Sequence, residues 1–145
     1  MLRSNPKNEV DTLVLSFWDK GYSTLNRKYG NYLSDPPRIG SYDIEVLART
    51  GEGYAIGIIL SEEELVNGPD ISKIRFLASR TSRKNGSPVK LFIGVPEDKV
   101  QQVRRILKLN LPGLMQNIFI IRLDEQENTL LPEKKRDYRI NRYIN

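Results

Sequence analysis

The chain has 145 residues, a length typical of one domain, and its composition excludes several kinds of chemistry. It contains no cysteine and no histidine, which excludes disulfides, thiolate zinc sites and hydrolases built on a Ser-His-Asp triad. Any catalysis would therefore depend on carboxylates, lysine, tyrosine or hydroxyl groups. We expect a single domain over residues 1–145.

No stretch of the sequence has the features of a membrane segment. All apolar runs are shorter than the roughly 20 residues that a membrane-spanning helix needs. The first residues also lack the apolar stretch of a signal peptide. We therefore expect a cytoplasmic protein without membrane contact.

Positive charge is unevenly distributed along the chain. The formal net charge is +5 and the isoelectric point is about 9.5, which suits polyanionic partners. Between residues 70 and 84 five bases accompany one acid, and a second basic segment covers residues 134–142. Such segments are either solvated faces or contacts to nucleic acid.

The first half of the chain has the pattern of a helix followed by a meander of strands. Apolar residues at spacings of three and four predict a helix over residues 8–20. Residues 22–29 are β-prone, and a proline-containing loop follows them. The strands 42–48 and 54–60 then form a hairpin. The second of them is apolar almost throughout, which predicts a central strand covered on both faces.

The second half alternates helices with strands. Residues 62–69 are predicted to form a loop, and a helix is expected to begin after the N-cap Asp70 and to end at Gly86. The strands 89–95 and 118–123 flank a further helix, which a proline opens and another proline ends. The residues expected to face the core from these helices are Ile71, Ile74, Leu77, Ala78, Thr81, Val100, Val103, Ile106 and Leu107.

The predicted order of elements is α-β-β-β-α-β-α-β, followed by a polar and basic C-terminal segment over residues 124–145. Short helices between strands return the chain to the same end of the sheet, so the second half requires parallel pairing. The sequence thus predicts an α/β fold with a mixed central β-sheet flanked by helices.

Three segments carry a resemblance to a known family. The opening helix contains Glu9 and leaves through a Gly-Tyr pair, residues 40–48 have the sequence GSYDIEVLA, and the apolar strand 54–60 precedes a helix and a further strand. Together with the α-β-β-β-α-β order, these features resemble the restriction-endonuclease-like, or PD-(D/E)xK, nucleases. They are most similar to archaeal Holliday junction resolvases and Mrr-type endonucleases. The resemblance implies a core that spans about residues 8–123.

The resemblance also implies that the catalytic residues are missing. In active relatives the second hairpin strand carries a Glu and, two residues later, a Lys, which hold a divalent cation and position the attacking water. With Asp43 placed on the family's Asp, these positions fall on Gly57 and Ile59, which supply no ligand and no proton acceptor. We therefore expect neither a metal site nor a catalytic residue. Glu9, Asp43 and Glu45 are the remnant candidates.

The remnant acids have alternative interpretations. Asp43 can cap a turn or pair with a base, and Glu9 can sit in a first helical turn where the dipole favours negative charge. Conversely, Glu45 shares a predicted strand face with Asp43, and the acids at 62–63 could join them to rebuild a Mg²⁺ site. The chain would then be an active metal-dependent DNA endonuclease.

The sequence favours a catalytically inactive, nuclease-like domain that binds DNA or another nucleic acid without a cofactor. The alternative is a structural or protein-interaction module whose cleft has become a filled core. Resolvase-like relatives also imply a homodimer. Tyrosines between residues 29 and 54 alternate with bases and could stack on nucleobases, although tyrosine is also common on half-buried strands. The expected nucleic-acid contacts are Arg38, Lys73, Arg75, Arg80, Arg83, Lys84, Lys134, Lys135 and Arg136.

Overall fold

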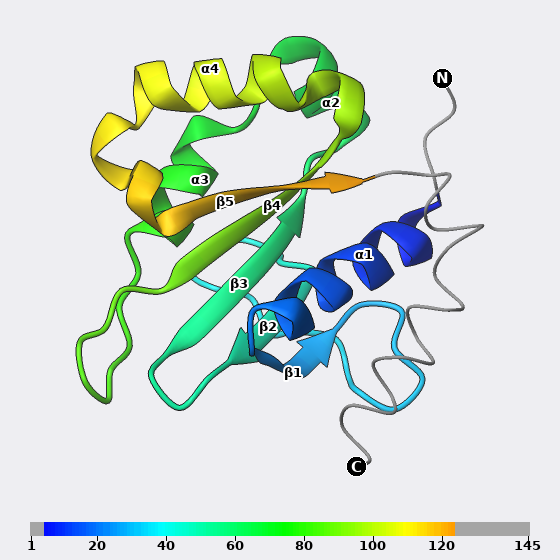
Figure 1. Cartoon of the computed structure of the whole chain (residues 1–145), viewed down its shortest axis with the longest axis vertical. Helices are drawn as coiled ribbons and strands as arrows, with labels where there is room; N and C mark the ends of the chain where they lie inside the picture. The colour runs from blue at the N-terminus through cyan, green and yellow to red at the C-terminus, as the bar shows by residue number, and fades with distance from the viewer. Residues whose placement is uncertain (1–4, 124–145) are drawn as a thin grey trace.

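A five-stranded mixed sheet forms the centre of the computed structural model, which describes residues 5–123 (Figure 1). Its strands are β1 (Ser23–Arg27), β2 (Val46–Arg49), β3 (Tyr54–Ile59), β4 (Lys90–Pro96) and β5 (Ile118–Leu123). They lie side by side in sequence order; β1, β2 and β3 pair antiparallel, whereas β3, β4 and β5 pair parallel. The predicted α/β class with a mixed central sheet is confirmed.

Helices cover both faces of this sheet. They are α1 (Pro6–Asp19), α2 (Glu62–Asn67), α3 (Ile71–Ala78) and α4 (Val100–Asn110), with 3₁₀ turns at Glu97–Lys99 and Pro112–Asn117. α1 lies on one face, and α3 and α4 lie on the other (Figure 1). Among the helices within residues 5–123, none is both long and apolar enough to cross a membrane.

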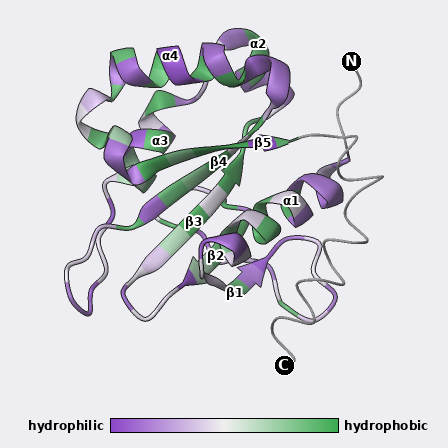
Figure 2. Ribbon diagram, in the orientation of Figure 1, coloured by the Kyte–Doolittle hydropathy of each residue, from purple (hydrophilic) through white to green (hydrophobic). Residues whose placement is uncertain are grey.

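The alternation of side chains along β3 divides the apolar core into two layers. Ala55 faces α1, where Leu13 and Phe17 are fully buried. Ile56 and Ile58 face the opposite layer, which α3 and α4 complete. Figure 2 shows that the central strands carry mostly hydrophobic residues, while α4 alternates between hydrophilic and hydrophobic stretches. β3 is therefore the buried central strand that its apolar sequence predicts.

Two predicted boundaries need correction on either side of β3. Residues 62–69 contain α2 and not only a loop, because Ser61 and Glu64 form a capping box that stabilises its first turn. The strand predicted over 42–48 begins only at Val46. Tyr42 instead pairs with Ile39 in an isolated bridge, while the N–H of Glu45 still donates to the carbonyl oxygen of Gly57 at 2.9 Å.

The helix after Asp70 is also shorter than predicted. Asp70 is its N-cap, as expected, but the helix ends at Ala78 and not at Gly86. The chain beyond it reverses, and the backbone N–H of Val89 donates to the carbonyl oxygen of Arg80 at 2.9 Å. Thr81, which was expected to face the core, is exposed because it lies in this reversal.

The close approach of α1 to β3 leads to a stability prediction. A Cβ atom at Gly57 would lie 2.9 Å from a ring carbon of Phe17 and 3.1 Å from the Cβ of Val46. Because overpacking a core costs about 1–3 kcal/mol, we expect Gly57→Ala to lower the free energy of unfolding by that amount in urea denaturation. The control is Gly51→Ala in the β2–β3 turn, where no atom lies within 4 Å. Equal stability of the two variants would contradict the expectation.

Candidate functional site

Packing closes the position that would carry the catalytic Glu in an active nuclease. Gly57 lies on the face of β3 that α1 covers, and Leu13 and Phe17 pack over it. The ring of Phe17 is itself held, because it stacks on Phe92 with 4.3 Å between ring centroids and meets Tyr22 edge-on at 5.8 Å. A carboxylate at position 57 therefore has no space unless α1 moves away from the sheet.

Glu45 serves as an internal hydrogen-bond acceptor. The backbone N–H of Ile59 donates to its Oε1 at 2.8 Å, and Nζ of Lys28 lies 3.5 Å from its Oε2. Burial raises the pKa of Glu45 above its usual value, although this hydrogen bond and the nearby Lys28 and Lys73 lower it. The side chain of Ile59 packs against the apolar layer under α1. Both carboxylate oxygens of Glu45 thus have partners within the fold.

The remaining candidate acids do not assemble a metal site with Glu45. Asp43 is exposed, and its Oδ1 accepts a hydrogen bond from Nε of Arg38 at 3.0 Å. Asp43 and Glu45 were expected to share a strand face, but Asp43 lies outside β2 and faces Arg38, whereas Glu45 accepts from the N–H of Ile59. Glu9 is buried on α1, and the acids at 62–63 lie in the first turn of α2. Within residues 5–123, no group of three or more acidic side chains could hold a metal ion.

A hollow of about 710 Å³ lies on the opposite side of the sheet, between the loop before β2, the hairpin strands and the turn after α3. We call it the basic hollow. Its cationic lining consists of Arg38, Arg80, Arg83 and Lys84, and its floor consists of Ile39, Leu47, Tyr54, Ile56, Phe76 and Val89. The floor residues belong to or pack against the layer of α3 and α4. Of the described residues that line the hollow, none is acidic.

Arg80 is held in a defined orientation within the basic hollow. Its Nε donates to the carbonyl oxygen of Phe76 at 2.9 Å, and its guanidinium carbon lies 3.9 Å from the centroid of the Phe76 ring. Tyr42 packs beside this ring with 5.4 Å between centroids. Gly40 lies so close that a Cβ there would be 2.7 Å from the ring, and its φ of +62° also favours glycine. The guanidinium plane is thus fixed before any ligand arrives.

The structure brings together four of the nine predicted nucleic-acid contacts, namely the cations of the basic hollow. Lys73 and Arg75 lie on α3 but do not line the hollow, and Lys73 instead acts on the buried Glu45. The remaining predicted contacts, Lys134, Lys135 and Arg136, lie outside the described residues.

Aromatic residues of the site were predicted only in part. Tyr54 lines the basic hollow and Tyr42 packs on its aromatic floor, whereas Tyr29 and Tyr32 lie elsewhere. Phe76 was not predicted as a functional residue. Its spacing of four residues before Arg80 on a predicted helix is the signal that could have identified the pair.

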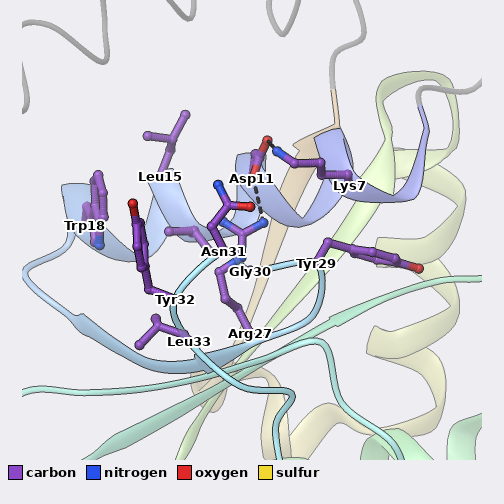
Figure 3. Close-up of a pocket in the computed structure, with 11 residues that line it drawn as sticks. Lys7, Asp11, Leu15, Trp18, Arg27, Tyr29, Gly30, Asn31, Tyr32 and Leu33 are labelled. Carbon is purple, nitrogen blue, oxygen red and sulfur yellow. Dashed lines mark hydrogen bonds and ion pairs between the residues drawn. The ribbon is translucent and has the colours of Figure 1, made fainter.

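A smaller pocket of about 290 Å³ lies between α1 and the loop that follows β1 (Figure 3). Its charges are already paired: Nη2 of Arg27 lies 2.6 Å from Oδ1 of Asp11, and Nζ of Lys7 lies 3.1 Å from Oδ2. Tyr29 and Tyr32 stand on its rim, with exposed fractions of 50% and 99%. Because two cations share one carboxylate here, this pocket has less uncompensated charge than the basic hollow.

The raised pKa of the half-buried Glu45 leads to a pH prediction. Because the pKa of Glu45 is raised in the folded state, this carboxyl group keeps its proton to a higher pH there than in the unfolded state. The contribution of Glu45 to the free energy of unfolding therefore falls as the pH rises above the usual carboxyl pKa. Glu45→Gln keeps an acceptor for the N–H of Ile59 and removes this dependence. We therefore expect the stability of the Gln variant relative to the wild type to increase between about pH 4 and about pH 7 in urea denaturation.

Glu63→Gln is the control for this series, because Glu63 is an exposed carboxylate on α2. The change in stability of Glu63→Gln with pH is subtracted from that of Glu45→Gln, because both variants lose one negative charge. A corrected difference for Glu45→Gln that shrinks as the pH rises would show that the prediction is wrong.

Comparisons with protein-family models, with curated proteins and with solved structures each find no match to this chain. The resemblance to the PD-(D/E)xK nucleases therefore rests on the quoted residues and the order of elements.

Proposed function

We propose that this chain is a nuclease-like domain that binds nucleic acid without cleaving it. One observation carries the proposal: the cations Arg38, Arg80, Arg83 and Lys84 meet in one hollow, and none of the described residues that line it is acidic. Cations that contact phosphates release condensed counterions, and this release drives binding. The excess of positive charge in the whole chain would also steer a polyanion toward the domain.

The position of the hollow relative to the lost catalytic positions supports binding without cleavage. Gly57 faces α1, whereas Leu47 and Ile56 of the hollow's floor face the other layer. A ligand in the basic hollow is therefore separated from position 57 by the sheet itself. Binding there requires no change in the contact between α1 and β3.

The packing at Gly57 also fits the alternative of a structural or protein-interaction module. The basic hollow counts against this alternative, because like charges gathered around one hollow repel each other unless an anion joins them. Within residues 5–123, Arg38 is the one cation of the hollow that forms an ion pair, with the exposed Asp43. The homodimer implied by the resemblance and a cytoplasmic location stay predictions.

The proposal predicts which cations set the affinity. Arg83 and Lys84 are exposed on the rim of the hollow, so their removal should leave the fold intact. In fluorescence anisotropy titrations with labelled DNA and RNA, we expect the double variant Arg83→Ala/Lys84→Ala to bind more weakly. We also expect the slope of log affinity against log salt to fall by about 2, one unit for each lost phosphate contact.

The matched control is Arg105→Ala/Lys108→Ala, which removes two exposed cations from α4 away from the hollow. We expect it to weaken binding far less than the rim variant does. An equal loss in both variants, or the absence of binding to every nucleic acid at low salt, would overturn the proposal.

The proposal also predicts that metal ions do not support cleavage. Incubation of the protein with labelled single-stranded, duplex and branched DNA in Mg²⁺ or Mn²⁺ should give no product on a denaturing gel, because position 57 supplies hydrogen where a ligand is needed. The variant Asp43→Asn tests whether any trace of cleavage depends on the carboxylate of Asp43. A product that forms with the wild type and disappears with this variant would restore the hypothesis of an active nuclease.

A further inference from the structure

The basic hollow combines two kinds of surface that suit different groups of one ligand. Its rim carries the exposed cations Arg38, Arg83 and Lys84, which suit phosphates. Its floor is apolar and aromatic, and it is formed by the hairpin strands and by Phe76 of α3. The backbone of a duplex can place phosphates and sugars against the rim, but it has no apolar group that could cover such a floor.

We propose that the basic hollow takes an unpaired nucleobase, while the rim cations hold the phosphates beside it. An unpaired base has an apolar face that can cover the floor and polar edges that can remain near the rim. The domain would therefore prefer single strands to paired nucleic acid. This inference deepens the proposed function and rests on it.

The volume of the hollow agrees with this ligand. At about 710 Å³ it lies within the range of about 300–1,000 Å³ in which proteins hold drug-sized ligands. A phosphate group alone would leave most of this space, and all of the apolar floor, to water. A base with its sugar fills more of this space and covers part of the floor.

The pair formed by Arg80 and Phe76 supplies a platform for stacking. The ring of Phe76 covers one face of the guanidinium, at 3.9 Å from the guanidinium carbon. A base would stack on the opposite face, as bases do on arginine planes in single-strand recognition. Lysine at position 80 would keep the charge but not the plane, so this platform is specific to arginine.

Hydrogen bonds hold both walls of the hollow in place. In one wall Ile39 and Tyr42 exchange backbone hydrogen bonds of 3.0 and 3.1 Å, and Gly40 between them packs on Phe76. In the other wall the N–H of Ser82 donates to the carbonyl oxygen of Ser87 at 2.8 Å. A preformed site loses little entropy when it orders around a ligand.

Anisotropy titrations with three matched oligonucleotides test the inference. They are a single strand of mixed sequence, the same strand paired with its complement, and a strand of equal length in which abasic sites replace the central bases. We expect the intact single strand to bind about tenfold more tightly than the duplex or the abasic strand at the same salt. Each of the three oligonucleotides is tested as DNA and as RNA, which shows which sugar is preferred. We expect the intact single strand to be preferred in at least one of the two series.

Two variants separate stacking from charge. Arg80→Lys and Phe76→Leu should each reduce the preference for the intact strand over the abasic strand to less than about threefold, while binding of the abasic strand stays within about twofold of the wild type. The rim variant Arg83→Ala/Lys84→Ala should instead weaken all three ligands. Circular dichroism and thermal unfolding check that each variant is folded.

Photocrosslinking of the wild-type protein keeps the test independent of any variant. A single strand that carries 5-iodouracil should crosslink to Tyr54 or Phe76 in the floor. Crosslinks confined to Tyr29 and Tyr32 beside α1 would overturn the inference, as would equal binding of the three oligonucleotides. Those results would leave the proposal of nucleic-acid binding intact, whereas no binding of any oligonucleotide at low salt would contradict both proposals.

Competition with an acidic peptide is a further test. If the peptide displaces the strand as readily as unlabelled single strand does, the inference is overturned, because the site would then bind polyanions in general.

Discussion

The contact between α1 and β3 at Gly57 constrains the rest of the structure. Phe17 lies so close to the sheet that a Cβ atom at this position would be 2.9 Å from its ring. Interiors are packed as densely as organic crystals, so such a contact cannot open for one side chain without moving its neighbours. The stack of Phe17 on Phe92 extends the constraint to β4. The absence of a side chain at position 57 and the close packing of α1 are therefore one structural feature.

Contacts within the fold account for the half-buried position of Glu45. Glu45 accepts from the N–H of Ile59 at 2.8 Å, and Lys28 balances part of its charge. The carboxylate of Glu45 thus satisfies a backbone N–H at the end of β3. These contacts give this acid a structural role within the fold.

The sequence predicted the layers of the fold better than it predicted the site. The order of helices and strands follows from apolar patterning, and β5 has its predicted limits because a short apolar run between polar residues marks them. The end of α3 was missed, because the apolar spacing continues to Thr81 while the backbone already pairs with Val89. The reversal is a turn whose hydrogen bonds join residues 80–89, and helical spacing of apolar residues does not show where such a turn begins. The same reversal places Arg83 and Lys84 on the rim of the basic hollow.

The hollow itself could not be predicted, because its cations come from two connections that are distant in the sequence. Arg38 precedes β2, and the others follow α3, so tertiary packing, including that of Gly40 and Tyr42 on Phe76, brings the two segments together. Net charge was a weak guide for the same reason: Lys73 and Arg75 belong to the same basic run but lie outside the hollow. Cations that line one hollow can act together on a single anion, whereas cations elsewhere on the surface cannot. A glycine and an aromatic ring in contact thus determine which of the basic residues can act on one ligand.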